Sequence, residues 1–64
     1  MESVAVIMEY IRYIKVSHPE LRVGQILVNA AHKAGWENDD IFYCPDEMLK
    51  KGLIEIAQEI VKKN

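Results

Sequence analysis

Five polar side chains recur at helical spacing in the middle of this 64-residue chain. They are Arg22, Gln25, Asn29, His32 and Lys33. If residues 21–35 form a helix, these side chains fall within an arc of roughly 100°, and small or apolar residues fill the rest of the circumference. An arginine can hold an anion through two parallel hydrogen bonds, and side-chain amides add directional donors and acceptors. This polar stripe, flanked by Trp36 and Tyr43, is the candidate binding surface for a partner or a small anionic ligand; the alternative is that it simply faces water.

The residue types needed for catalysis occur only in weak arrangements. Cys44 could act as a nucleophile with His32 as its base, but no oxyanion donor is evident, and a lone cysteine is usually a buried hydrophobic residue. A solvated loop and the start of a helix explain the acids of 37–40 and 46–47. The sequence has no phosphate-binding glycine loop, no CxxC pair and no HExxH motif. We therefore expect a non-enzymatic protein without a metal or a cofactor.

The composition predicts a soluble chain with more apolar surface than one small core can cover. Of its residues 50% are hydrophobic and 28% are charged. No apolar run approaches the ~20 residues of a membrane span. A chain of this length buries only about 60% of the surface that its unfolded form exposes. Self-association is the simplest way to cover the remainder, so we expect a homo-oligomer, most simply a dimer.

The net charge and the cysteine content indicate which class of partner and which cellular compartment to expect. The net charge of −2 gives no field that would attract a phosphate backbone, so nucleic acid is a disfavoured partner. The single cysteine, Cys44, cannot form an intramolecular disulfide, and Glu2 stands where a signal peptide would carry basic residues. These features favour a reducing cytoplasm.

Apolar periodicity predicts three helices, over about residues 3–16, 19–34 and 45–62. The first is expected to bury Val4, Ile7, Met8, Ile11 and Ile14, and the last Leu49, Leu53, Ile56 and Ile60. Additional apolar side chains lie beside these rows, namely Val6, Tyr10, Tyr13, Ile54 and Val61. Either other helices of the same chain or a second subunit could cover them. Tyrosine suits an interface because it combines a large rigid area with a polar end, so these five are the predicted oligomer interface.

The middle helix is expected to lie at the centre of the domain because its circumference is almost wholly apolar. Ser17 and Glu20 have the spacing of a capping box at its start, and Gly35 can take the left-handed conformation that ends a helix. Gly24 and Ala31 leave a shallow strip where another backbone can approach.

The connection over residues 36–43 is expected to be irregular and packed on the core. Within it, residues 41–43 are apolar and prone to β structure. They predict either an extended plug over the core or a short strand paired with a symmetry mate.

Several motifs resemble a group of short, mostly uncharacterised bacteriophage and bacterial proteins. They are Pro-Glu-Leu-Arg-Val-Gly-Gln at 19–25, Asn-Ala-Ala at 29–31, Gly-Trp at 35–36, Asp-Ile-Phe-Tyr at 40–43 and Asp-Glu at 46–47. The shared pattern is Leu-Arg-x-Gly-Gln followed by Asp-x-Phe-Tyr, and the resemblance covers about residues 18 to 53. It implies a small phage-type accessory protein, a class that commonly blocks a host factor or sequesters a host signalling molecule.

These features predict one all-α domain of three helices, over residues 1–64, that forms a homo-oligomer. The first functional hypothesis is a protein that binds and inhibits a host factor through protein–protein contact. The second is an oligomer that sequesters a nucleotide-like signal between subunits through Arg22, Gln25, Asn29, His32 and Tyr43. The third is a DNA-binding accessory protein of the helix-turn-helix type, which the polar stripe favours and the acidic balance opposes.

Overall fold

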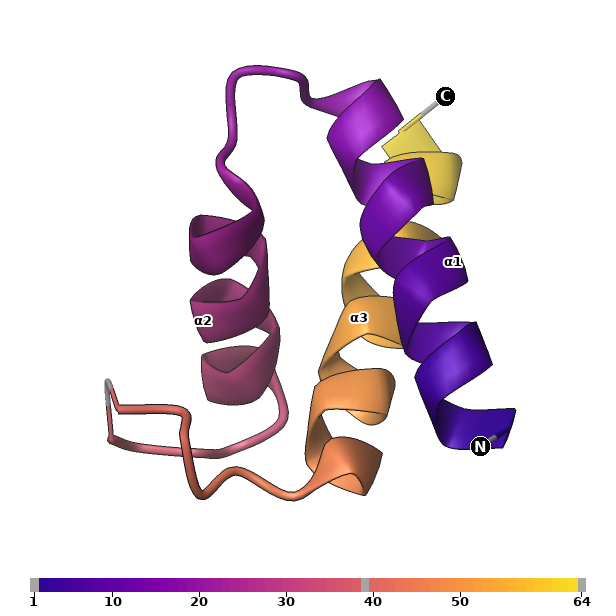
Figure 1. The fold of residues 1–64 in the computed structure, drawn as a ribbon. Helices are drawn as coiled ribbons and strands as arrows, with labels where there is room; N and C mark the ends of the chain where they lie inside the picture. The colour runs from indigo at the N-terminus through magenta and orange to yellow at the C-terminus, as the bar shows by residue number, and fades with distance from the viewer. Residues whose placement is uncertain (1, 39, 64) are drawn as a thin grey trace.

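The computed structural model describes residues 2–38 and 40–63. Three helices make up the fold: α1 (Glu2–Ser17), α2 (Val23–Lys33) and α3 (Asp46–Lys63). The described residues contain no strand, so the all-helical prediction is confirmed. Asp39, one of the acids of the predicted loop, lies outside the described residues. Figure 1 shows that α1 and α3 run in the same direction. α2 lies between them in the sequence and runs in the opposite direction.

The central helix is α3 and not α2, which corrects the sequence-based expectation. α3 packs against both other helices, whereas α1 and α2 share the smallest contact (Figure 1). Gly52 makes the α2–α3 contact close, because a Cβ at this position would lie 1.8 Å from the carbonyl oxygen of Ala30. Gly24 is exposed and has nothing within 4 Å of such a Cβ, so the predicted close approach at Gly24 is wrong.

The core is formed by one buried cluster to which all three helices contribute. Its members are Ile14, Ile26, Ala30, Leu53 and Ile60. The predicted row of α3 is confirmed, since Leu53 and Ile60 are buried and its other two members are half-buried.

The predicted buried face of α1 is only partly correct. Ile14 is buried and Ile7 and Ile11 pack against the core cluster as predicted, but Val4 is 47% and Met8 64% exposed. Tyr10, which the sequence places beside this face, also packs against the core cluster.

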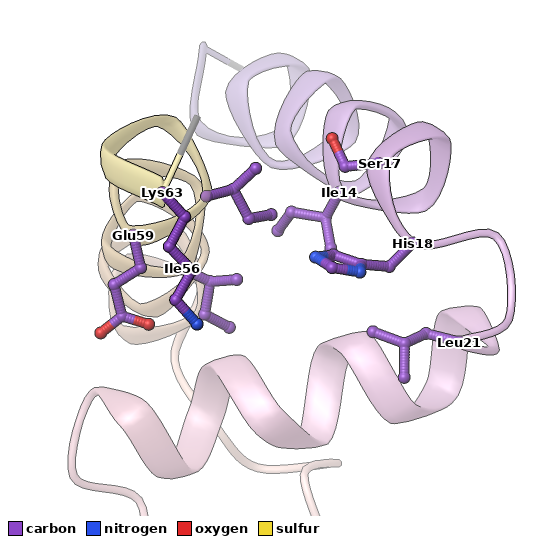
Figure 2. Close-up of a pocket in the computed structure, with 8 residues that line it drawn as sticks. Ile14, Ser17, His18, Leu21, Ile56, Glu59 and Lys63 are labelled. Atoms are coloured by element: carbon purple, nitrogen blue, oxygen red, sulfur yellow. The ribbon is translucent and has the colours of Figure 1, made fainter.

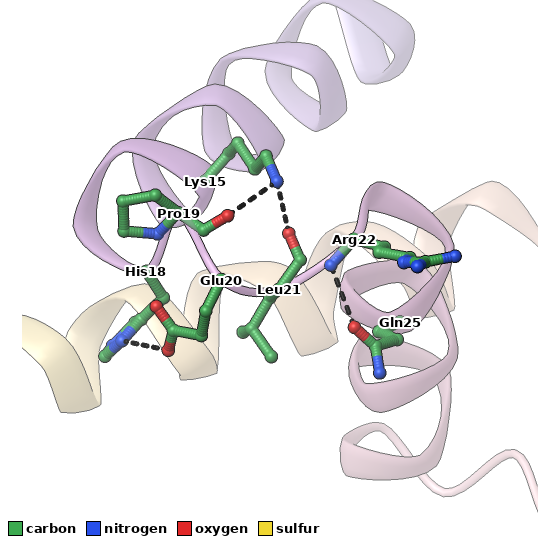
Figure 3. A network of polar contacts seen from close by, with 7 residues as sticks. All are labelled: Lys15, His18, Pro19, Glu20, Leu21, Arg22 and Gln25. Carbon is green, nitrogen blue, oxygen red and sulfur yellow. Dashed lines mark hydrogen bonds and ion pairs between the residues drawn. The ribbon is translucent and has the colours of Figure 1, made fainter.

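The α1–α2 connection delays the start of α2 from the predicted residue 19 to Val23. Lys15 on α1 holds this connection, because its Nζ donates hydrogen bonds to the carbonyl oxygens of Pro19, at 2.9 Å, and Leu21, at 2.5 Å (Figure 3). A further turn is closed by the Leu21 amide, which donates to the His18 carbonyl at 3.0 Å. Residues 18–22 are therefore an ordered corner and not the first turn of a helix.

The cap of α2 differs from the predicted capping box. Arg22 is the N-cap residue, and Gln25 Oε1 accepts a hydrogen bond from its backbone N–H at 2.8 Å (Figure 3). Glu20, the expected acidic partner of the box, instead lies 3.5 Å from Nδ1 of His18. The box fails at residue 17 because Ser17 still belongs to α1.

The end of α2 is as the sequence predicts. Gly35 has a φ of 107°, and its N–H donates to the His32 carbonyl at 3.0 Å. The next amide, of Trp36, donates to the Ala31 carbonyl at 2.9 Å. This pair of bonds is the Schellman motif, which needs a residue in the left-handed region at Gly35.

Replacing Gly35 tests that requirement. We expect Gly35→Ala to destabilise the fold by about 1–2 kcal/mol, because a Cβ disfavours the left-handed conformation. Gly35→Asn should lose less, since asparagine tolerates this region better than alanine does. Urea denaturation of both variants measures the difference, and equal losses would contradict the explanation.

Candidate functional site

The polar stripe lies on the solvent side of α2. Arg22, Gln25, Asn29 and His32 are exposed, and Trp36 beyond the helix end is half-buried. The stripe thus avoids the core, as its spacing indicates, and the buried residues of α2 are on the other side of the helix. Its position is compatible both with a binding surface and with a face that meets only water.

Gln25 and Lys33 of the stripe make contacts that stabilise the fold. Gln25 caps its own helix through the Arg22 amide, and the Lys33 ammonium is paired with Glu59 of α3. The hydrogen bond from Lys33 lowers the pKa of Glu59, and the same bond raises the pKa of Lys33. The Gln25 and Lys33 side chains thus help to hold α2 in place. Fewer polar groups of the stripe are then available to bind a ligand.

The predicted site residues are too far apart to surround one small molecule. Arg22 is at the start of α2, and Trp36 and Tyr43 follow its end in the chain. A helix of 11 residues is about 16 Å long. Neither of the two cavities described below is lined by any of the six predicted residues. Within one chain, these residues form an extended surface and not a pocket.

The connection between α2 and α3 places two aromatic rings on the outside of the protein. Phe42 is 80% and Tyr43 75% exposed. Their ring centroids are 4.9 Å apart, with an interplanar angle of 83°, which is an edge-to-face pair. The predicted plug over the core is therefore wrong: only Ile41 and Cys44, on either side of the pair, turn inward. We call residues 36–44 the aromatic loop.

The side chains of Asn38 and Asp40 accept hydrogen bonds from backbone amides of the aromatic loop. The Asp40 amide donates to Asn38 Oδ1 at 2.9 Å, and the Phe42 amide donates to Asp40 Oδ1 at 3.0 Å. Such bonds reverse the chain locally in place of backbone bonds. Trp36 Nε1 donates to the Asp40 carbonyl at 3.1 Å, so the start of the loop is tied to its middle. The Cys44 amide donates a hydrogen bond to the Ile41 carbonyl at 3.0 Å, which closes a turn over residues 41–44. Both rings are on the outside of this turn.

The sequence missed this arrangement because hydrophobicity alone placed residues 41–43 inside. The Asp40 side chain is the available signal, since an aspartate two residues before Phe42 has the spacing of a local turn. A turn at this point cannot bury three consecutive side chains. The side chains that turn inward are instead those of Ile41, which is half-buried, and Cys44, which is buried.

Cys44 behaves as the buried hydrophobic residue that the sequence suggests. Its side chain is buried at 7% exposure. Burial raises the pKa of the thiol above its ordinary value of 9.0, and the Asp46 carboxylate adds to the shift. A raised pKa lowers the thiolate fraction at neutral pH, which is the opposite of what a nucleophilic cysteine needs.

Alkylation tests this assignment of Cys44. We expect iodoacetamide to modify the folded protein more slowly than the urea-unfolded chain at the same pH. The pH at which the folded thiol becomes reactive should lie above that of the unfolded thiol, because only the folded state buries it. A folded rate equal to the unfolded rate would show that the thiol is neither buried nor shifted.

A groove between α1 and α3 brings together three of the five predicted interface residues. It has a volume of about 580 Å³. Its lining consists of Tyr10, Tyr13, Ala57, Gln58, Val61 and Lys62. Val61 is 60% and Tyr13 38% exposed, whereas Ala57 is buried and forms the floor. The remaining two predicted residues, Val6 and Ile54, are half-buried.

A second cavity of about 470 Å³ lies where α1 ends beside α3 (Figure 2). Its lining is Ile14, Ser17, His18, Leu21, Ile56, Glu59, Ile60 and Lys63. Apolar side chains from the core and the corner form its inner part, with polar groups around them (Figure 2). Sequence reasoning missed it, because its walls come from distant segments that meet only in the folded chain.

No protein-family model matches the chain, and comparisons with curated proteins and with solved structures found no match. The resemblance to phage and bacterial proteins therefore stays a prediction. Among the described residues, none of the helices combines the length and hydropathy that a membrane span requires.

Proposed function

We propose that this chain is a small non-enzymatic accessory protein of the phage type, which binds and inhibits a host protein by direct contact. The observation that carries the proposal is the exposed edge-to-face pair of Phe42 and Tyr43. Aromatic residues are enriched at protein interfaces, where a few of them provide most of the binding free energy. The hydrogen bonds from the Phe42 amide to Asp40 and from the Cys44 amide to Ile41 fix the backbone on both sides of the pair, which lowers the conformational entropy lost on binding.

The distribution of the predicted site residues supports a protein partner over a small ligand. The exposed stripe residues Arg22 and Asn29 extend along α2 and could contact the rim of a partner whose centre meets the aromatic loop. A small molecule held by one chain would need these groups around a single cavity. The net charge of −2 keeps nucleic acid the least favoured partner.

The proposal is tested by capture from a bacterial host lysate with immobilised protein. Wild type should retain a distinct host protein, and Phe42→Ala/Tyr43→Ala should lose it while keeping the wild-type thermal unfolding midpoint. Met8→Ala is the matched control, because Met8 is 64% exposed on α1, outside the loop and the stripe. Retention of the same host protein by the double loop variant would overturn the role of the loop.

A second variant separates the loop from the stripe. Arg22→Ala/Asn29→Ala should weaken capture less than the double loop variant does, because rim contacts contribute less than a buried aromatic anchor. If neither pair of substitutions changes capture while the fold persists, the site is elsewhere on the protein.

We also propose that the protein is a homo-oligomer. The exposed apolar side chains of Val4, Met8, Tyr13 and Val16 on α1 and of Val61 on α3 support this, since self-association would cover some of them. Light scattering during size-exclusion chromatography at micromolar concentration measures the mass, and a stable monomer would contradict the proposal.

A further inference from the structure

We infer that the partner of the aromatic loop presents an apolar pocket whose rim carries lysine and arginine side chains. This partner chemistry rests on the proposed function, because it describes the surface that Phe42 and Tyr43 would contact. The charged residues that flank the two rings in the chain, Asp40 and Asp46, are both acidic.

The charges of this chain are unevenly distributed along the sequence. Residues 34–49 contain five of the ten acidic residues and none of the eight lysines and arginines. This segment begins directly after α2, includes the aromatic loop and ends in α3. The connection that it forms lies at the end of the molecule opposite the α1–α2 corner (Figure 1). The surface around the aromatic pair is therefore far more acidic than the net charge of −2 suggests.

The lysines on either side of this segment do not neutralise its acids. Lys33 is paired with Glu59 of α3, and Lys50 lies 3.1 Å from the carboxylate of Glu47. Three exposed carboxylates have no basic group within 4 Å among the residues that the structure describes. They are Glu37, Asp40 and Asp46. The macrodipole of α3 offsets a part of the charge in its first turn, and the loop acids keep theirs.

These carboxylates are close enough to the rings to belong to the same interface. Asp40 Oδ1 accepts the hydrogen bond of the Phe42 amide, and the Cα atom of Asp46 is at most about 14 Å from that of Phe42, four residues earlier. The bond from Trp36 Nε1 to the Asp40 carbonyl brings the start of the loop, with Glu37, beside the same turn. A standard interface covers about 800 Å² per partner, or a disc about 16 Å in radius. A partner that buries the rings therefore also meets the acids.

The acids determine which charge the partner must carry. Like charges across an interface cost free energy, whereas opposite charges accelerate the encounter of the two proteins. The rings themselves need an apolar pocket, as aromatic anchors do. An apolar pocket with a basic rim satisfies both requirements. The same carboxylates oppose an anionic membrane, into which exposed aromatic rings could otherwise insert.

Selection from a displayed library of random peptides tests this chemistry without a known partner. Wild type should select sequences in which lysine or arginine flanks aliphatic or aromatic residues. Salt should weaken their binding, because the Debye length falls from about 10 Å at 0.1 M to about 3 Å at 1 M. Phe42→Ala/Tyr43→Ala should not select these sequences. Selection of acidic or uncharged peptides, or of none that depend on the two rings, would overturn the inference.

Neutral variants test the carboxylates directly. Glu37→Gln/Asp46→Asn removes two charges whose side chains make no hydrogen bond among the described residues, and it leaves the Asp40 turn intact. Its association rate with the retained host protein should fall about 10-fold at low salt, and the difference should vanish near 1 M salt. Glu9→Gln/Glu20→Gln makes the same change in net charge at exposed sites outside the loop and should associate nearly as fast as wild type. Equal rates for the two double variants would contradict the basic rim.

The outcomes separate this inference from the proposed function. A host protein that needs both rings, yet binds Glu37→Gln/Asp46→Asn like wild type at every salt concentration, would contradict the basic rim alone. Basic peptides selected through the rings, with no host protein retained, would contradict the function alone. Ring-dependent sedimentation with vesicles of phosphatidylcholine and phosphatidylglycerol would assign the rings to a membrane and overturn both.

Discussion

Replacing Gly52 with alanine is expected to destabilise this protein by about 3 kcal/mol or more. The added Cβ would lie 1.8 Å from the carbonyl oxygen of Ala30 and 2.6 Å from its carbonyl carbon. Both atoms belong to the backbone of α2, so no side-chain rotation can relieve the clash. The two helices must separate, which opens the core around Ile26 and Leu53.

The matched control is the same substitution at Gly24. Gly24 is helical and exposed, and a Cβ there meets nothing within 4 Å. Gly24→Ala should therefore stabilise the fold, by up to about 1 kcal/mol, through its higher helix propensity. Chemical denaturation measures both variants. A Gly52→Ala variant as stable as wild type would show that α2 and α3 do not approach as closely as the structure has them.

Truncating Leu53 to alanine is the second change with a large expected effect. Leu53 is 0% exposed, and it lies on the central helix within the buried cluster. Such truncations cost about 2–5 kcal/mol, from lost burial and from the cavity that remains. A domain of this size has a total stability of roughly 3–10 kcal/mol, so the variant should be largely unfolded at 37 °C.

Circular dichroism during thermal unfolding measures this loss. Met8→Ala is the control, because the same kind of truncation at a side chain that is 64% exposed should leave the unfolding midpoint nearly unchanged. Equal effects at the two positions would contradict the placement of the core.

The elements with strong local signals could be predicted from the sequence. Three helices follow from apolar periodicity, and the end of α2 follows from the conformational freedom of Gly35. The start of α2 could not be predicted in the same way. It depends on Lys15, whose ammonium reaches from α1 across the corner to the Pro19 and Leu21 carbonyls.

The packing of the helices was harder to predict than their existence. The nearly continuous apolar surface of residues 21–35 predicts a central helix, yet α3 is the helix that packs against both others, and Gly52 lets it approach the backbone of α2 closely. Val23 on α2 is 46% exposed. Hydrophobicity describes what a helix can bury, whereas its neighbours decide what it does bury.

The candidate site was predicted in part. The sequence predicts Trp36 and Tyr43 as flanks of the polar stripe, and both belong to the aromatic loop. The exposure of Phe42 could not be predicted from hydrophobicity, because it depends on the turn that Asp40 forms with the Phe42 amide. The hydrogen bond that Gln25 accepts at the start of α2 depends on where that helix begins, which the sequence does not predict.

The most direct test of the central claim is the affinity between the purified protein and the host protein that it captures. Isothermal titration should show that Phe42→Ala and Tyr43→Ala each weaken binding by about 30-fold, as expected when an aromatic anchor worth about 2 kcal/mol is removed. Met8→Ala should bind like wild type. Unchanged affinity for both loop variants, with an intact fold, would contradict the claim that this protein binds its partner through the aromatic loop.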